Sequence, residues 1–86
     1  MYQLEFLPSA KKELKKLDKV AQIKIKEKLL LLIEKPNDLK NNIKSLKGEY
    51  SGLFRLRVTN YRVIFRVEEE RVIITIIRIG HRKDIY

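Results

Sequence analysis

Cysteine is absent from this chain of 86 residues, which excludes disulfide bonds and thiolate metal sites. We therefore expect a protein of the reducing cytoplasm that holds no metal and no cofactor. The longest apolar runs, Leu29 to Ile33 and Val72 to Ile74, are far shorter than the roughly 20 residues that span a membrane as a helix. No basic segment followed by an apolar one opens the chain, so we expect neither export nor a membrane partner.

Arginine is missing from the first half of the chain. All seven arginines lie between Arg55 and Arg82, whereas twelve of the thirteen lysines lie between Lys11 and Lys47. The formal net charge of +9 predicts attraction to nucleic acid, to an anionic surface or to an acidic protein, and it does not choose among them. Because the planar guanidinium matches the geometry of phosphate, the arginine-rich half is the better candidate for phosphate recognition.

The stretch 53–66 is the most informative part of what we expect to be one small domain, residues 1–86. Two alternating runs rich in β-branched and aromatic residues flank Thr59-Asn60, which predicts a β-hairpin because Asn tolerates the positive φ of a tight turn. With two residues in the turn, Val58 pairs with Tyr61. Alternation then places on one face, the core face, Phe54, Leu56, Val58, Tyr61, Val63 and Phe65. The opposite face carries Leu53, Arg55, Arg57, Arg62, Ile64 and Arg66.

The arginine-rich side of this hairpin is unfavourable for folding alone. Arg57 and Arg62 fall directly opposite each other, and like charges in such a pair destabilise a hairpin. One interpretation is a solvated outer face on which long side chains splay apart. The other is an anion site, because converging guanidinium groups become favourable once a polyanion is bound.

A strand and a short helix are predicted at the start of the chain. Residues 2–6 alternate between apolar and polar side chains, which predicts a strand that stops at Pro8. Ser9 fits the N-cap of an amphipathic helix that runs to Leu17.

A second helix, capped by Asp18, is expected from Lys19 to about Lys35. Its apolar side chains form two stripes on nearly opposite sides. The broader stripe contains Ala21, Ile25, Leu29 and Leu32, and the narrower one contains Val20, Ile23, Leu30 and Leu31. The favoured arrangement is a helical hairpin laid across a sheet, with part of the narrower stripe open for another protein.

The second half of the chain is predicted to add three strands. Residues 40–42 belong to a polar connection, and the run 72–77 is apolar on both faces, as in a central strand. Gly80 is expected to break that strand and to leave 81–86 as a short polar tail. The predicted order is β-α-α-β-β-β, an α+β fold in which the helical hairpin packs on a small, mainly antiparallel sheet.

Three segments resemble the RelE branch of the RelE/ParE toxin superfamily. They are LFRLRV at 53–58, NYRVIF at 60–65 and IGHRKDIY at 79–86, and they agree with that family in order and spacing. The resemblance covers nearly the whole chain and implies the family's compact, microbial-RNase-like fold. It also implies a toxin of a type II toxin–antitoxin pair, a metal-independent endoribonuclease that cleaves messenger RNA in the ribosomal A site. In that reaction the RNA 2′-hydroxyl attacks the neighbouring phosphate and leaves a 2′,3′-cyclic phosphate.

The resemblance also implies roles for residues at matching positions. Arg55 and Arg57 match strand sites that hold the RNA backbone, where some relatives have lysine. Arg62 matches the residue that stabilises the phosphate in the transition state, and Arg82 matches the position that aids the leaving group. Tyr86 matches an aromatic residue that stacks on a base or assists proton transfer. The further candidates for RNA binding are Arg66 and Lys83.

A general base is harder to assign than these cationic roles. Arginine does not accept a proton at ordinary pH. His81, the sole histidine, carries the side chain that ordinarily titrates near neutrality, so it is a catalytic candidate. Its alternative role is a cap or hydrogen-bond partner just beyond a glycine. The alternative for Tyr86 is a frayed chain end.

Two other functions are alternatives to RNA cleavage. The ParE branch shares the fold and the Tyr-Arg pattern, and its members poison DNA gyrase without cutting RNA. Arg82 and Tyr86 favour the nuclease branch. A non-catalytic domain that binds RNA or DNA is the second alternative. The resemblance implies an acidic antitoxin as partner, with a toxin–antitoxin heterotetramer as one form of the complex, in addition to the ribosome and messenger RNA.

Overall fold

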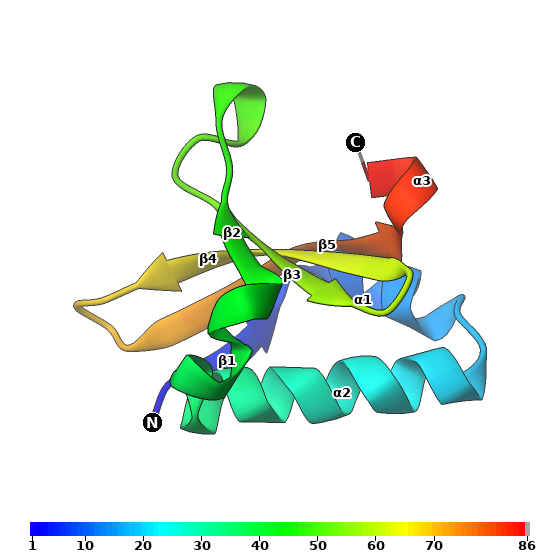
Figure 1. Ribbon diagram of the computed structural model, residues 1–86, viewed down its shortest axis with the longest axis horizontal. Coiled ribbons are helices and arrows are strands. Elements are labelled where there is room, and N and C mark those ends of the chain that lie inside the picture. The colour runs from blue at the N-terminus through cyan, green and yellow to red at the C-terminus, as the bar shows by residue number, and fades with distance from the viewer. Residues whose placement is uncertain (86) are drawn as a thin grey trace.

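The computed structural model describes residues 1–85 and has the expected α+β fold (Figure 1). Helices α1 (Pro8–Lys15) and α2 (Lys19–Glu34) follow the first strand, and helix α3 (Arg82–Ile85) comes last. The strands are β1 (Gln3–Phe6), β2 (Ile43–Ser45), β3 (Phe54–Val58), β4 (Tyr61–Glu68) and β5 (Ile73–His81). Two short 3₁₀ helices, η1 (Pro36–Asn42) and η2 (Gly48–Tyr50), flank β2.

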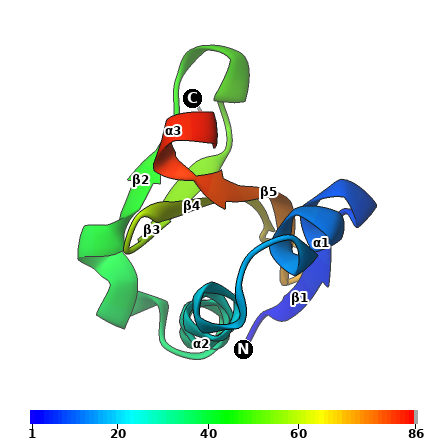
Figure 2. The same ribbon diagram turned by 90° about the vertical axis from the view of Figure 1, so that its right-hand side faces the viewer.

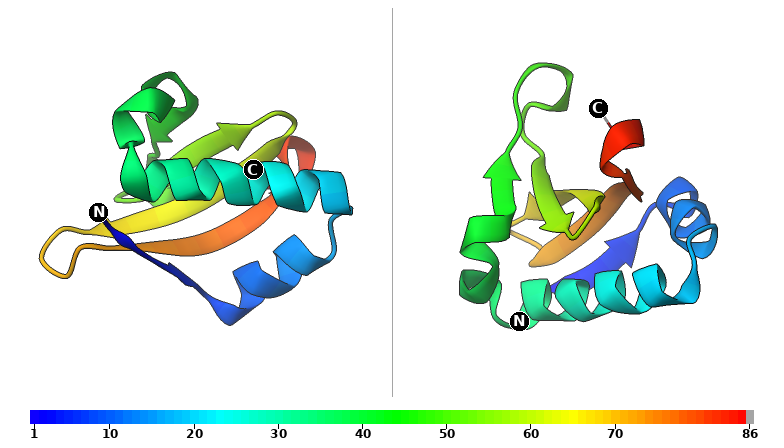
Figure 3. Two further views of the ribbon diagram at one scale, coloured as in Figure 1. Left: turned by 90° about the horizontal axis from the view of Figure 1, so that it is seen from below. Right: turned by 45° about the vertical axis from the view of Figure 1, so that its right-hand side comes forward.

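These strands form one sheet in the order β1-β5-β4-β3-β2. Strand β1 runs parallel to β5, and the other neighbours are antiparallel. Helix α2 lies across one face of the sheet, while η2 and α3 rise from the other face (Figures 1 and 2). Helix α1 packs against β5 beside β1 (Figure 2). The expected pair of helices is therefore present, but only α2 crosses the sheet (Figure 3).

The register of the β3–β4 hairpin is the predicted one. Val58 pairs with Tyr61, and Arg57 pairs with Arg62. The positive φ of the turn falls on Thr59, at 52°, rather than on Asn60. The Thr59 hydroxyl donates a hydrogen bond to the Val58 carbonyl at 2.7 Å. The carbonyl of Asn60 has a separate use, since it accepts a hydrogen bond from the start of α3.

The hydrophobic core lies between α2 and the sheet. Asp18 caps α2 as predicted, because its Oδ1 accepts the Ala21 amide at 2.8 Å. The broader stripe of α2 is buried, and the side chains that face it from β3, β4 and β5 are Leu56, Val58, Val63, Phe65, Ile74, Ile76 and Ile79. Burying a large apolar side chain contributes about 1.5–3 kcal/mol, so this layer is the main source of stability.

Two predictions for the first half of the chain were wrong in detail. The connection after η1 contains an edge strand, because Ile43–Ser45 pair with β3. Three residues are too few to display the alternation that identifies a strand in a sequence. Helix α1 begins at Pro8 after the N-cap Leu7, so Ser9 lies inside the helix. Proline suits this position because the first helical turn leaves its N–H groups without helical partners in any case.

The C-terminal segment also differs from its prediction. Gly80 does not break β5; it pairs with Arg62 inside the strand. Residues 82–85 form α3, and Ile85 is buried. A Cβ atom at Gly80 would lie 3.0 Å from the Ile85 Cδ1, so the absence of a side chain lets α3 approach the sheet closely. The described part of the tail is therefore anchored by packing.

Candidate nucleic-acid interface

The face of the sheet opposite α2 carries two rows of residues that include most of the predicted RNA-binding arginines. Cross-strand partners share a face. One row contains Lys44, Arg55, Ile64 and Arg78. The second row, next to the hairpin turn, contains Arg57, Arg62 and Gly80. We name as the arginine face the surface formed by Lys44, Arg55, Arg57, Arg62 and Arg78.

The guanidinium of Arg62 is held over the hairpin turn. Its Nη1 donates to the carbonyl oxygen of Thr59 at 3.0 Å and to that of Tyr61 at 2.9 Å. The two carbonyl dipoles offset part of the repulsion between Arg62 and its cross-strand partner Arg57. Arg57 and Arg62, whose pairing is unfavourable for folding alone, thus lie together at one end of the arginine face.

Helix α3 begins beside the same turn. The Arg82 amide donates to the Asn60 carbonyl oxygen at 2.8 Å, which ties the start of α3 to the hairpin. Arg82 and Lys83 are exposed. The structure therefore brings backbone positions 57, 62 and 82, all arginines, to the same end of the sheet.

His81 lies on the other side of the sheet from Arg62. It pairs with Tyr61, so both side chains point to the α2 side, and their rings meet edge to face with centroids 5.7 Å apart. The Nδ1 of His81 accepts the Lys83 amide at 3.2 Å. In a neutral imidazole this hydrogen bond places the proton on Nε2, so the ring must release Lys83 before Nδ1 can take a proton. This arrangement fits the alternative role predicted for His81, a hydrogen-bond partner just beyond a glycine.

A polar network that the sequence reasoning missed supports the first row of the arginine face. Strand β1 ends at Phe6. Farther along the same edge of β5, the side chain of Glu13 from α1 makes the contact with the strand. The Glu13 Oε1 accepts the Ile79 amide at 2.9 Å, and its Oε2 pairs with the Arg78 Nη2 at 3.3 Å. A sequence signal existed, since Glu13 is the only acidic residue of α1.

Tyr50 of η2 also reaches Arg78. A hydrogen bond with the Tyr50 hydroxyl raises the pKa of the Arg78 guanidinium; burial opposes this rise and Glu13 adds to it. Arg78 belongs to the same cross-strand row as Arg55 and Ile64. Ile64 is fully buried although we expected it on an open face. The Arg55 Nε is buried as well, and it has no hydrogen-bond partner within residues 1–85.

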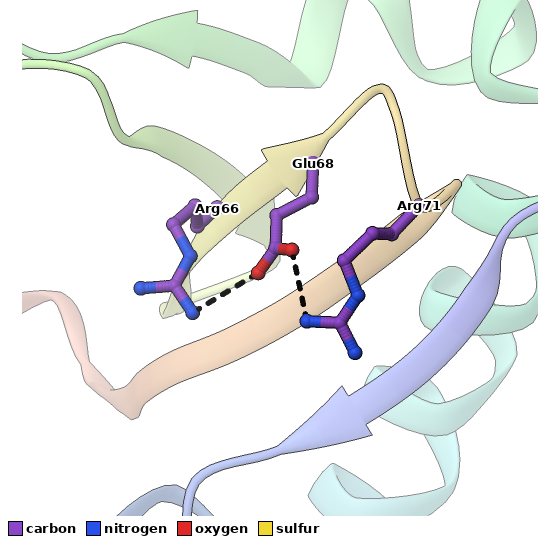
Figure 4. A network of polar contacts seen from close by, with 3 residues as sticks. All are labelled: Arg66, Glu68 and Arg71. Atoms are coloured by element: carbon purple, nitrogen blue, oxygen red, sulfur yellow. Dashed lines mark hydrogen bonds and ion pairs between the residues drawn. The ribbon is translucent and has the colours of Figure 1, made fainter.

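Arg66 is separated from the other predicted residues. It follows Arg62 by four positions on β4, which corresponds to about 13 Å along a strand. Its Nη2 pairs with the Glu68 Oε1 at 3.4 Å, and the Glu68 Oε2 pairs with Arg71 at 3.3 Å (Figure 4). The structure therefore places Arg66 in a small ion-pair network near the β4–β5 turn, away from the hairpin end of the arginine face.

Tyr86, the last predicted catalytic residue, lies outside the described residues. Within residues 1–85, no group of three or more carboxylate or imidazole side chains is placed to hold a metal ion. In the same part of the chain, the helices are too short or too polar to cross a membrane.

Comparison with known proteins identifies the family. Residues 4–86 match the family model of the ParE toxin of the type II toxin–antitoxin system parDE. A RelE-like toxin of Escherichia coli is 31% identical over 87 residues, which cover 99% of this chain and 90% of that protein. The mRNA interferase toxin RelE of Escherichia coli K12 is 30% identical over 82 residues, which cover 95% of this chain and 84% of that protein.

Solved structures show the same fold. The RelBE2 toxin–antitoxin complex of Mycobacterium tuberculosis matches with a TM-score of 0.82 and 28% identity, over 94% of this chain and 98% of that one. The isolated RelE toxin of Escherichia coli matches with a TM-score of 0.77 and 28% identity, over 94% and 84% of the two chains. The RelB–RelE complex of Methanococcus jannaschii matches with a TM-score of 0.75 and 33% identity, over 95% and 94%. The chain therefore belongs to the RelE/ParE toxin superfamily and is a RelE-like toxin of a type II toxin–antitoxin system.

Proposed function

We propose that this toxin is an endoribonuclease that cleaves messenger RNA in the ribosomal A site. The observation that carries the proposal is the position of Arg57, Arg62 and Arg82 at one end of the sheet, on a hairpin and helix tied together by a hydrogen bond. Converging guanidinium groups are favourable when they share a phosphate and unfavourable without one. Two relatives with 30% identity are named mRNA interferases, which supports RNA as the ligand.

In the proposed reaction the 2′-oxygen of one nucleotide attacks the neighbouring phosphorus while the bond from phosphorus to the 5′-oxygen breaks. The 2′-hydroxyl loses its proton and the departing 5′-oxygen gains one, so the products are a 2′,3′-cyclic phosphate and a 5′-hydroxyl. Negative charge grows on the phosphate oxygens, where a guanidinium that is already positioned stabilises it without reorganisation. We assign that role to Arg62 and assistance of the leaving group to Arg82. As proposed, the reaction needs no metal.

The remaining predicted residues have supporting roles in this proposal. Arg55 and Arg57 bind the RNA backbone along β3, and Lys83 extends the positive charge onto α3. Tyr86 stacks on a base. Arg66 contributes to binding only if RNA competes with Glu68 for its guanidinium. The general base is left unassigned, because His81 points to the α2 side of the sheet.

Primer extension on messenger RNA from translating ribosomes tests the proposal. The purified toxin should produce cuts within ribosome-bound messenger and leave the same RNA intact without ribosomes. The family model that matches bears the ParE name, so DNA gyrase inhibition is the second candidate. A supercoiling assay run in parallel separates the two, because inhibition of supercoiling without RNA cleavage would contradict the nuclease proposal. Retardation of RNA on a gel without cleavage or inhibition would indicate a non-catalytic binding domain.

We further propose that an acidic antitoxin binds and neutralises this toxin. Five of the matching structures are named as complexes of a RelE toxin with RelB. The narrower stripe of α2 is largely open, with Val20, Ile23 and Leu30 exposed by 63%, 56% and 55%. An amphipathic antitoxin helix can cover these residues while its acidic side chains meet a chain of net charge +9.

Co-expression with the small open reading frame next to this gene tests the partnership. Growth arrest by the toxin alone, together with rescue and pull-down by the neighbouring product, is the expected result. The stoichiometry of the purified complex shows whether it is a heterotetramer. A harmless toxin, or a neighbour that neither binds nor rescues, would contradict the proposal.

A further inference from the structure

The segment 44–50 lines an open hollow that the proposed cleavage reaction does not use. Its volume is 350 Å³, and its lining residues are Lys44, Ser45, Leu46, Lys47 and Tyr50. This volume falls within the range of about 300–1,000 Å³ that is common for ligand sites. Because Lys44 pairs with Arg55, the hollow is continuous with the first row of the arginine face. The chain that lines it rises from the end of β2 into η2, away from the sheet (Figure 1).

Backbone hydrogen bonds hold the walls of this hollow in place. The Leu46 amide donates to the Leu53 carbonyl, and the Leu53 amide donates to the Tyr50 carbonyl, both at 3.0 Å. Gly48 and Gly52 adopt positive φ angles of 68° and 89°, which residues with side chains rarely tolerate. These hydrogen bonds and turns fix the backbone of the segment before any ligand binds. The entropy lost by ordering the segment on binding is therefore small.

The lining combines the two chemistries that single-stranded nucleic acid requires. The lining residues include the aromatic Tyr50 and the apolar Leu46, and the exposed Lys44 and Lys47 provide ammonium groups. Proteins bind single-stranded RNA by stacking bases on aromatic rings and tracking the backbone with cations. A peptide with acidic side chains would satisfy the lysines but would leave the stacking surface without a matching group.

We propose that this hollow binds one nucleotide of RNA, with the base against Tyr50 and the adjoining phosphate at Lys44 and Lys47. The inference rests on the proposed function, because it extends the path of RNA from the arginine face onto η2. The nucleotide can come from the messenger or from ribosomal RNA, and both present the same base and phosphate.

Equilibrium binding tests the inference without depending on cleavage. The probe is a short single-stranded RNA with 2′-O-methyl groups, which removes the attacking hydroxyl. Tyr50→Ala should weaken binding roughly tenfold because base stacking is lost. Tyr50→Phe should bind as the unchanged protein does, because it keeps the ring and loses only the hydroxyl. If Phe weakens binding as much as Ala does, Tyr50 acts through Arg78 and the stacking role is overturned.

The lysines have their own test in the salt dependence of binding. Replacing both Lys44 and Lys47 with alanine should lower the magnitude of the slope of log K against log salt by about 0.7, since the two lysines share one phosphate and each phosphate contact on a single strand contributes about 0.7. The matched control replaces Lys16 and Lys35, which are exposed near the ends of α1 and α2. Equal slopes for the two double variants would overturn the inference. This measurement also decides the matter if Tyr50→Ala does not fold.

Photocrosslinking on ribosomes identifies the source of the nucleotide. Messenger containing 4-thiouridine should crosslink at segment 44–50 if the messenger supplies the base, and 4-thiouridine in ribosomal RNA should do so if the ribosome supplies it. Crosslinking of neither, or equal competition against the RNA probe by polyglutamate, would overturn the inference. A toxin that binds the probe as expected but never cleaves ribosome-bound messenger would contradict the proposed function and leave the binding site intact.

Discussion

The two faces of the sheet differ in what covers them. Helix α2 covers one face with apolar side chains, so burial specifies the residues there. The arginine face is covered only in part, by Tyr50 on one side and by Ile85 of α3 on the other. Apolar burial stabilises the fold with no ligand present, whereas opposed arginines destabilise it. Neighbouring residues of β3 belong to different faces, so adjacent positions allow a core residue to be compared with a residue of the proposed RNA site.

Leu56→Ala is expected to have the largest effect on stability. Leu56 is fully buried between α2 and the sheet, and truncation of such a residue costs about 2–5 kcal/mol. The matched change at the next residue, Arg57→Ala, should leave the free energy of unfolding within about 0.5 kcal/mol because Arg57 is exposed. Urea denaturation followed by circular dichroism measures both. Similar losses for the two variants would refute the division between the faces.

Arg62→Ala is expected to have the largest effect on activity. Loss of one positioned donor to a developing charge typically lowers the rate on the order of a hundredfold or more. The circular dichroism spectrum should be retained, since Arg62 lies outside the core cluster. Arg71→Ala is the matched control, because it removes an exposed arginine from the β4–β5 turn, where it pairs with Glu68. Cleavage by the Arg62 variant at the control's rate would remove Arg62 from the site.

Local patterns in the sequence predicted the hairpin well. Alternating residues around a two-residue turn determine both the register and the face of each side chain, so the opposition of Arg57 and Arg62 could be deduced without coordinates. The cap at Asp18 and the broader stripe of α2 follow from similarly short-range patterns, and both were confirmed. The described candidates at positions 57, 62 and 82 lie at one end of the sheet. His81 lies at the same end but on the α2 side, and Arg66 lies farther along β4.

Long-range contacts account for what could not be predicted. The link from Tyr50 to Arg78, and the link from Glu13 to Ile79, join residues far apart in the sequence. Neither contact leaves a periodic pattern. Gly80 was interpreted as a strand breaker because glycine often has that role, while its actual use is to admit Ile85. Ile64 was expected on an open face because alternation assigns a side chain to one face of the sheet but does not reveal what covers that face.

Glu13→Ala is expected to have an intermediate effect, because it disturbs the support of the arginine face from the edge of β5. The Ile79 amide would lose its acceptor at 2.9 Å, and an unsatisfied backbone donor costs about 1–3 kcal/mol. Glu13→Gln keeps an acceptor oxygen and loses only the partly exposed ion pair with Arg78, so it should lose less than about 1 kcal/mol. Thermal unfolding of both variants measures the difference. Equal losses would show that the ion pair, rather than the amide contact, carries the effect.

Changes at His81 are expected to have the smallest effect and to show which face the proton chemistry uses. His81→Asn places an oxygen near the former Nδ1, where it can still accept the Lys83 amide, and His81→Gln does so less well. We expect His81→Gln to lose about 0.5–1.5 kcal/mol, the worth of one hydrogen bond, and His81→Asn to lose less.

The pH dependence of cleavage on ribosomes decides the role of His81. Neither variant carries a group that titrates near neutrality, so an imidazole base would make the acidic limb of the profile disappear in both. We expect the acidic limb to persist in both variants, because His81 points to the α2 side of the sheet and its Nδ1 already accepts a hydrogen bond from the Lys83 amide. A flattened profile in both variants, with the fold retained, would show that the imidazole leaves Lys83 and reaches the RNA. A residue on the α2 side would then take part in cleavage, and the two faces of the sheet would not be separate in function at the end of β5.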